Sequence, residues 1–197
     1  MKKIIYLTLS IALLSACSLF PTKTSTPTPT PTTPVTSVTI TNIPAQKITN
    51  TDHNPIVAIK TKNGQIVLRL YQDKAPNTVK IFLTKAASGF YNNLTFHRVI
   101  AGFMAQGGDP TGTGTGGGRE KSELNSIPFK RGSIGLARTP DTKEYSNDSQ
   151  FFICFTTEQC QQLTGDYVNF GEVISGFDVL DAIQQGDKII EITQNTK

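Results

Sequence analysis

The 197-residue sequence contains few of the side chains on which most enzymes rely for their chemistry. It has no tryptophan, three cysteines and two histidines, His53 and His97. No cluster of histidine, cysteine and carboxylate residues has the spacing of metal ligands, and no Gly-x-Ser-x-Gly motif is present. The sequence therefore favours neither a metalloenzyme nor a serine hydrolase, and we expect no metal and no cofactor.

Strong charge is also absent. The chain carries 19 basic and 15 acidic residues, a net charge of +4, and two of the basic residues are Lys2 and Lys3 at the N-terminus. If that terminus is removed, 17 basic residues stand against 15 acidic ones. Because this charge is small and dispersed, it does not form the basic surface of a nucleic-acid-binding protein, and we expect no nucleic-acid partner.

The first sixteen residues have the form of a secretory signal peptide. A short basic start is followed by an apolar run at residues 4–16, which is too short to span a bilayer. The run ends in Leu14-Ser15-Ala16-Cys17, which resembles the bacterial lipoprotein processing box. That resemblance implies a signal peptide at residues 1–16, a lipid on Cys17 and an exported protein anchored to a membrane, on its periplasmic or cell-surface side. The alternative is an ordinary signal peptide that happens to precede a cysteine.

Residues 17–53 differ in composition from the rest of the chain. From Pro21 to Pro34 nearly every residue is proline or threonine. Proline removes backbone donors and threonine buries little apolar surface, so we expect a disordered, lipid-anchored stalk, with a possible short strand at residues 38–40. Nearly all large apolar residues lie in residues 54–197, which are enough for one domain with a single core.

The pattern of apolar residues within 54–197 predicts a mainly β domain. Alternating apolar positions predict two strands joined at Asn63-Gly64, followed by a helix that starts at Pro76 and ends before Gly89. Further short strands are expected at residues 94–100, 103–106, 133–137, 150–155, 169–173 and 188–193, and a second helix at 177–184. Many short strands with few helices suggest a closed antiparallel barrel with helical lids.

Arg98 is the unusual residue of this pattern. Strand alternation places Phe96, Arg98 and Ile100 on one face, and Gln150, Phe152 and Cys154 on one face of a later strand. An arginine among apolar neighbours could serve a site. It could equally well extend its charged end to water over an apolar surface, and spacing alone does not decide between these roles.

Two further motifs carry weaker signals. Gly112 to Gly117 fits the dinucleotide-binding pattern G-x-G-x-x-G, but no apolar helical stripe follows it, so we interpret it as a glycine-rich surface loop. Cys154 and Cys160 could pair in an oxidising compartment. Sequence spacing does not establish the geometry that a disulfide needs, and we expect two separate thiols.

Several separated segments resemble the signature segments of cyclophilins. They are Phe96-His97-Arg98, Gly102 to Asp109, Ser149 to Ile153, Asp73 to Val79 and Val168 to Val173. The resemblance covers about residues 55–193. It implies a closed eight-stranded antiparallel β-barrel capped by two α-helices, with peptidyl-prolyl cis/trans isomerase activity on X-Pro bonds of exported proteins.

The resemblance also implies roles for individual residues. Arg98 matches the family's catalytic arginine, and Gln106 and Gln150 match polar residues that hold the substrate backbone. The walls of the proline pocket match Phe103, Met104 and Phe152, its edge matches Leu163, and the segment that aligns a substrate strand matches Ala137 and Arg138. Tyr167 stands where eukaryotic relatives often have histidine. Gln162 stands where many relatives have tryptophan, so cyclosporin is expected to bind weakly.

Isomerase activity would account for the missing catalytic groups. Rotation about the X-Pro bond makes and breaks no covalent bond, so it requires no nucleophile, general base or metal. The expected partners are proline-containing unfolded or extended polypeptides and, through the lipid, a membrane; the domain is expected to be a monomer. The alternative is a lipid-tethered chaperone or adhesin that binds proline-containing segments with little turnover.

Overall fold

The computed structural model describes residues 54–195. The predicted signal peptide, Cys17, the stalk and the predicted strand at residues 38–40 lie outside the described residues. The helices and strands are β1 (Ile56–Thr61), β2 (Gly64–Leu70), α1 (Pro76–Ala87), β3 (Arg98–Ile100), β4 (Met104–Gly107), β5 (Arg119–Lys121), β6 (Ser133–Leu136), β7 (Tyr145–Asn147), β8 (Phe151–Cys154), α2 (Thr157–Cys160), the 3-10 helix η1 (Gln161–Leu163), β9 (Asn169–Ser175), α3 (Phe177–Asp181) and β10 (Glu191–Gln194). Within this range no helix is long and apolar enough to cross a membrane.

The main sheet has eight antiparallel strands in the order β10-β1-β2-β9-β6-β8-β4-β3, which confirms the predicted fold class. Its edge strands β3 and β10 share no ladder. The segments that precede them close the barrel instead: the amide of Phe96 donates to the carbonyl of Asp187, and the amide of Ile189 donates to that of Leu94, both at 2.8 Å. Closure therefore depends on two short connecting segments rather than on a continuous ladder.

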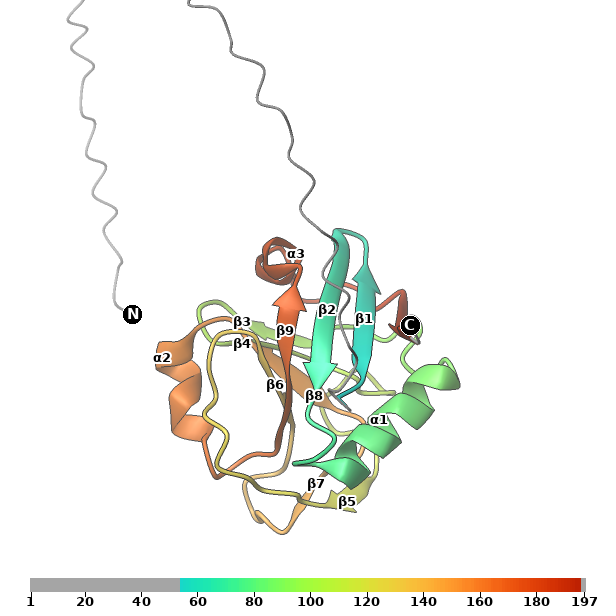
Figure 1. Cartoon of the computed structure of the whole chain (residues 1–197). Coiled ribbons are helices and arrows are strands. Elements are labelled where there is room, and N and C mark those ends of the chain that lie inside the picture. The colour runs from blue at the N-terminus through green and yellow to red at the C-terminus, as the bar shows by residue number, and fades with distance from the viewer. Residues whose placement is uncertain (1–53, 196–197) are drawn as a thin grey trace, which may run out of the picture. The chain divides into compact units, whose positions relative to one another are not determined.

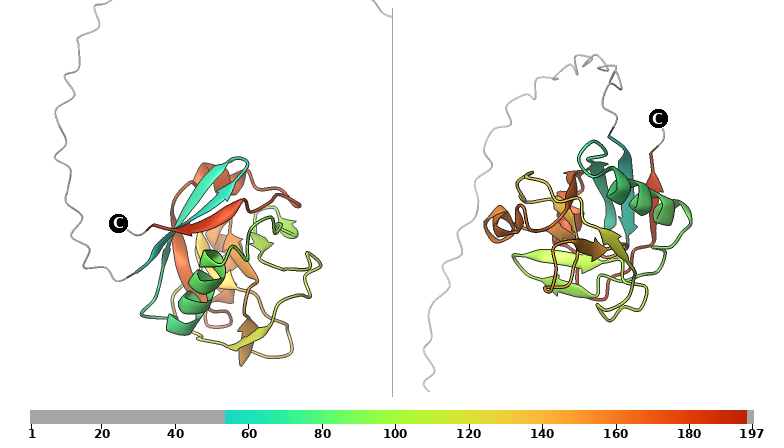
Figure 2. Two further views of the ribbon diagram at one scale, coloured as in Figure 1. Left: turned by 90° about the vertical axis from the view of Figure 1, so that its right-hand side faces the viewer. Right: turned by 90° about the horizontal axis from the view of Figure 1, so that it is seen from below.

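The barrel interior is the hydrophobic core. Alternate residues of the strands point inward, as in β2, where Ile66, Leu68 and Leu70 are fully buried. Helix α1 adds Val79 and Phe82 to the same core, as its apolar spacing predicts. Figure 1 shows α1 beside β1 and β2 at one end of the barrel and α3 at the other, and Figure 2 shows the same barrel from two further sides.

The ends of the described chain lie side by side. Strand β10 pairs with β1, so that Gln194 stands opposite Val57. The amide of Asn195 also donates to the carbonyl of Ile56 at 2.9 Å. This pairing confirms the strand predicted at residues 188–193, with a later start. Strand β10 begins at Glu191, because residues 186–189 form the hydrogen bonds that close the barrel.

Five elements depart from the sequence-based expectations. The short helices α2 and η1, and the two-stranded sheet of β5 and β7, were not predicted. The second predicted helix is shorter than expected, because α3 ends at Asp181, although Ile183 beyond it is still buried.

The prediction of two separate thiols is wrong. Cys154 and Cys160 form a disulfide, with their Cα atoms 6.2 Å apart. Cys160 ends α2 instead of lying in an open loop, and this helical turn brings it back against β8. Because spacing alone predicted no turn after β8, it gave no reason to place the two sulfur atoms together.

The N-terminus of α1 is held by two carboxylates from the segment around β5. Glu123 accepts hydrogen bonds from the amides of Asn77 and Thr78, and Glu120 accepts one from the Thr78 hydroxyl at 2.9 Å. The second oxygen of Glu120 is buried and has no hydrogen-bond partner among the described residues. Burial raises the pKa of Glu120 to about 7; the Thr78 hydrogen bond and Lys85 oppose the rise, and Glu123 and Asp148 add to it.

Replacing Glu120 with glutamine is expected to stabilise the domain at pH 8 and to change little at pH 5. A raised pKa in the folded state gives a contribution to stability that is complete below the unfolded value of about 4.5 and lost as the pH rises through about 7. A glutamine at this position still accepts the hydrogen bond from the Thr78 hydroxyl, but it has no carboxyl group to ionise as the pH rises. Thermal unfolding at the two pH values measures the effect. Glu158→Gln, at an exposed position on α2, is the control, and an equal shift at both pH values would contradict the prediction.

Candidate active site

The outer faces of β4 and β8 carry a second apolar cluster beside the core. Along β8, Phe151 and Ile153 point into the barrel, whereas Phe152 and Cys154 point outward. Phe152 stands opposite Gln106 in the ladder, and Cys154 stands opposite Met104. Of the predicted shared face of Gln150, Phe152 and Cys154, the part formed by Phe152 and Cys154 is confirmed, and it is an outer face of the barrel. Gln150 precedes β8 and does not belong to the strand.

The predicted shared face of Phe96, Arg98 and Ile100 is wrong. Phe96 is fully buried in the barrel core, whereas Arg98 and Ile100 are exposed. Strand β3 begins only at Arg98. Because residues 96 and 97 lie in the segment that closes the barrel, the two-residue alternation of a strand does not extend back to Phe96.

A hollow of about 170 Å³ opens over this outer cluster. Nine of the ten domain residues that the sequence singles out surround it. They are Arg98, Phe103, Met104, Gln106, Ala137, Arg138, Phe152, Leu163 and Tyr167. The tenth, Gln150, does not line the hollow, but it accepts a hydrogen bond from Gln106, which does. The resemblance to cyclophilins thus selects residues from five separate segments that the fold brings together.

Arg98 stands at the rim of the hollow, and most of its donors have no hydrogen-bond partner among residues 54–195. Its Nη1 donates to Oε1 of Gln106 at 3.2 Å and lies 4.0 Å from the sulfur of Met104. Among residues 54–195 no carboxylate forms an ion pair with it. The neighbouring imidazole of His97 has its pKa lowered, chiefly by burial, so it is neutral at pH 7 and does not repel the guanidinium.

A relay of amide groups orients Gln106. Its Nε2 donates to Oε1 of Gln150 at 2.9 Å, and Nε2 of Gln150 donates to the carbonyl of Gly116 at 2.8 Å. Since the amide nitrogen of Gln106 is engaged by Gln150, its oxygen faces Arg98. The relay therefore holds both the glutamine and the guanidinium in place.

Aromatic rings build the floor of the hollow. Phe152 is stacked on Phe129 with ring centroids 5.5 Å apart and meets the edge of Tyr167 at 5.7 Å. Gly135 makes room for this stack, because a Cβ there would lie 2.6 Å from the ring of Phe152 and 2.7 Å from that of Phe129. Phe129 was not among the residues predicted for the site, since nothing in its sequence surroundings distinguishes it from an ordinary core residue.

The segment after β6 offers a backbone edge beside the hollow. Both backbone groups of Ala137 are used, by Gln150 and Asn147. The amide and carbonyl of Arg138, in contrast, have no hydrogen-bond partner within the described range. The Arg138 side chain is fixed: its guanidinium donates to the carbonyls of Thr139, Thr142 and Asp166 and lies 4.5 Å from the Tyr167 ring. An extended peptide could therefore pair with this one residue.

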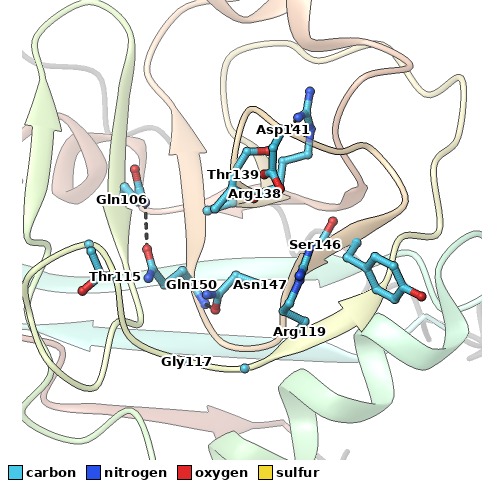
Figure 3. A pocket seen from close by; sticks show the side chains of 14 residues that line it. Gln106, Thr115, Gly117, Arg119, Arg138, Thr139, Asp141, Ser146, Asn147 and Gln150 are labelled. Atoms are coloured by element: carbon cyan, nitrogen blue, oxygen red, sulfur yellow. Dashed lines mark hydrogen bonds between the residues drawn. The ribbon is translucent and has the colours of Figure 1, made fainter.

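A second and larger hollow, of about 520 Å³, continues from the first and shares Gln106, Ala137 and Arg138 with it. Figure 3 shows the Gln106–Gln150 hydrogen bond at one side and Arg119 and Ser146, from the small sheet of β5 and β7, at the other. Sequence reasoning missed this hollow, because strands of three residues are too short to be predicted from alternation.

The glycine-rich segment forms one wall of this second hollow. Asp109 holds the segment by accepting hydrogen bonds from the amide and hydroxyl of Thr111 and from the amide of Gly114. A Cβ at Gly117, which has a φ of +88°, would lie 2.6 Å from the side chains of Asn147 and Ser149. The glycines thus allow the loop to pack closely against the turn between β7 and β8, which carries Gln150. The element that follows the loop is the strand β5, not a helix.

Comparisons with known proteins agree with this geometry. Residues 56–196 match the family model described as cyclophilin type peptidyl-prolyl cis-trans isomerase/CLD. A peptidyl-prolyl cis-trans isomerase of Helicobacter pylori is 50% identical over 138 residues, which cover 66% of this chain and 81% of that protein. One from Synechococcus elongatus is 39% identical, covering 68% of this chain and 92% of that protein.

A solved structure has the same fold. The crystal structure of a cyclophilin type peptidyl-prolyl cis-trans isomerase from Cryptosporidium parvum superposes with a TM-score of 0.67 and 33% identity, covering 74% of this chain and 99% of that one. A second crystal structure of that protein was obtained in the presence of the dipeptide Ala-Pro.

The N-terminus has a match of its own. Residues 1–18 match the model of a prokaryotic membrane lipoprotein lipid attachment site, which indicates an exported protein anchored to a membrane.

The family of the chain is determined by the barrel domain, which makes up most of the sequence. Both the family model and the curated relatives cover it, so the chain belongs to the cyclophilin-type peptidyl-prolyl cis-trans isomerases.

Proposed function

We propose that residues 54–197 isomerise X-Pro bonds in exported, unfolded or extended polypeptides, with Arg98 as the central catalytic side chain. The observation that carries this proposal is the position of Arg98 at the rim of a hollow with walls of Phe103, Met104 and Phe152. Among residues 54–195 no carboxylate pairs with its guanidinium. The barrier to rotation about a peptide bond is about 18–20 kcal/mol, because the bond has partial double-bond character. A site that binds the twisted amide more tightly than the planar one lowers that barrier.

The apolar walls hold the substrate's proline. Phe103, Met104 and Phe152 bury the pyrrolidine ring, with Leu163 and Tyr167 at its edge. Burying the ring holds the proline side of the X-Pro bond still, so that the residue before proline rotates about this bond relative to the fixed ring. The hollow is lined by side chains of the second apolar cluster and opens to the surface, which leaves it accessible to a chain segment.

Arg98 acts on the developing lone pair. As the amide twists, conjugation is lost and the prolyl nitrogen becomes a better hydrogen-bond acceptor. The guanidinium donates to the prolyl carbonyl and approaches this nitrogen, and its fork of donors serves both better than the single ammonium of lysine would. Gln106 orients the guanidinium through the 3.2 Å contact, and Gln150 orients Gln106 in turn.

The substrate backbone is aligned by Arg138, and Ala137, whose backbone groups are already hydrogen-bonded, lines the hollow beside it. The free amide and carbonyl of Arg138 pair with an extended peptide, and the second hollow receives residues next to the proline. Because none of these steps transfers a proton, the mechanism requires no general acid or base.

At the cell envelope the domain acts while it is anchored to the membrane through its N-terminal segment. A lipid on Cys17 holds the chain at the membrane after removal of residues 1–16, and residues 17–53 separate the monomeric domain from the bilayer on its periplasmic or cell-surface side. The composition of residues 21–34 supports a spacer without a core. Mass spectrometry of the mature N-terminus tests this proposal: an unmodified peptide that starts elsewhere than at Cys17 would contradict it.

The activity is tested with an Ala-Pro-containing peptide in an NMR exchange assay. The domain is expected to accelerate cis/trans exchange from its uncatalysed timescale of about 10–100 s into the range that produces exchange cross-peaks. Peptide titration in the same spectra measures binding. Binding without faster exchange would favour the alternative of a tethered chaperone or adhesin, and neither binding nor exchange would refute both.

A further inference from the structure

The Cys154–Cys160 disulfide lies directly behind the proline hollow. Both cysteines are fully buried and belong to the same apolar cluster as Met104 and Phe152. Cys154 stands opposite Met104 in the ladder, and the sulfur of Cys160 lies 3.5 Å from the carbonyl oxygen of Phe103. The bond therefore joins the strands that carry one wall of the hollow to the segment that carries the other.

Apart from the disulfide, that second wall is held by separate noncovalent contacts. Arg138 donates to the carbonyl of Asp166 and lies over the Tyr167 ring, and the Thr156 hydroxyl donates to the carbonyl of Gly102. Leu163 and Tyr167 follow Cys160 in a segment made of α2, η1 and a turn, of which the two helices have four and three residues. Helices of this length are not stable by themselves. The hydroxyls of Thr157 and Thr164 each accept one backbone amide hydrogen bond, from Arg131 and Phe129 respectively, at 3.0 Å. The disulfide is the covalent tether of the segment.

We propose that Cys160, through its bond to Cys154, is a positioning residue that fixes the Leu163–Tyr167 wall and thereby sets the affinity for proline substrates. The proposal rests on the proposed function of this hollow. The two cysteines are only six residues apart, so the bond restricts the unfolded chain much less than a long cross-link would, and its main effect is local. Arg98 and Gln106 lie on β3 and β4, away from the tethered segment, and keep their geometry without it.

The affinity thereby depends on the thiol redox state. A dithiol reductant supplies two electrons and two protons, breaks the Sγ–Sγ bond to give two thiols, and is itself oxidised to a disulfide. In an oxidising envelope the bond persists. Because both sulfur atoms are fully buried, the reductant reaches them only when the α2–η1 segment opens or the domain unfolds.

The test compares three forms of residues 54–197 in the peptide exchange assay. They are the oxidised wild type, the wild type unfolded in dithiol and refolded without oxygen, and Cys154→Ala/Cys160→Ala. Both forms without the bond are expected to show a KM raised by about three- to tenfold and a kcat within about twofold of the oxidised protein. Amide hydrogen exchange is expected to accelerate at Tyr167, whose amide donates to Leu163. If the double variant fails to fold, the reduced wild type decides, because it keeps both sulfur atoms in the core.

Two controls separate positioning from general destabilisation. Val57→Ala, in the core strand β1 far from the hollow, is expected to lower Tm without changing KM. Leu163→Ala removes part of the wall itself, so its KM effect and that of the cysteine variant are expected to be less than additive. An unchanged KM in both disulfide-free forms, or full additivity, would overturn the proposal. An inactive oxidised wild type would instead refute the proposed function.

Discussion

Replacing Arg98 with alanine is expected to lower kcat/KM for X-Pro exchange by about 10²–10³, the usual cost of removing one preorganised donor from such a site. Its guanidinium has no ion-pair partner among residues 54–195 and the side chain is exposed, so the fold loses little when it is removed. Thermal unfolding is therefore expected to be nearly unchanged, while the exchange rate in the NMR assay falls.

Two further variants sharpen this test. Arg98→Lys keeps the positive charge but not the forked donors, and it is expected to recover only a small part of the activity. Lys121→Ala, at an exposed position on β5, removes the same charge elsewhere and is expected to leave kcat/KM unchanged. An active Arg98→Ala, or one that does not fold, would count against the assigned role.

Introducing tryptophan at position 162 is expected to strengthen inhibition by cyclosporin about 10- to 100-fold over a weakly inhibited wild type. Gln162 lies exposed on η1 beside Leu163, and its side-chain amide donates to the carbonyl of Gln159 at 3.0 Å and to no other group of residues 54–195. Many cyclophilins have tryptophan at the matching position. An indole adds a broad apolar face and an N–H donor, together worth roughly 1.5–3 kcal/mol.

The inhibition constant in the exchange assay measures this effect. Gln161→Trp, one position earlier and also exposed, is the matched control and is expected to leave the inhibition constant unchanged. Nanomolar inhibition of the unaltered protein would show that the residue at position 162 does not limit cyclosporin binding.

The parts of the fold that follow a long apolar period could be predicted from the sequence. The turn at Asn63-Gly64 and the stripe of α1 each rest on several consecutive positions, so local chemistry and the final fold agree there. The resemblance to cyclophilins supplied the residues around the hollow. They come from distant segments, and no local pattern relates Arg98 to Leu163 or Tyr167.

Other features depend on tertiary contacts that leave no local pattern. Phe96 turns inward because residues 94–96 close the barrel against residues 186–189. The disulfide forms because α2 folds Cys160 back onto β8, and the second hollow depends on two three-residue strands. The barrel closure and the second hollow join segments that are far apart in sequence, and the disulfide depends on a four-residue helix, so a periodicity argument reaches none of them.

The meeting of Asn195 with Ile56 has a practical consequence for protein engineering. A domain whose folded ends adjoin can be grafted as a cassette into an exposed loop of a host protein, with both junctions at one point of its surface. The hollow lies over β4 and β8, and the junctions would lie at β1 and β10, so a sensor or a refolding enzyme made in this way would keep its substrate face uncovered by the splice.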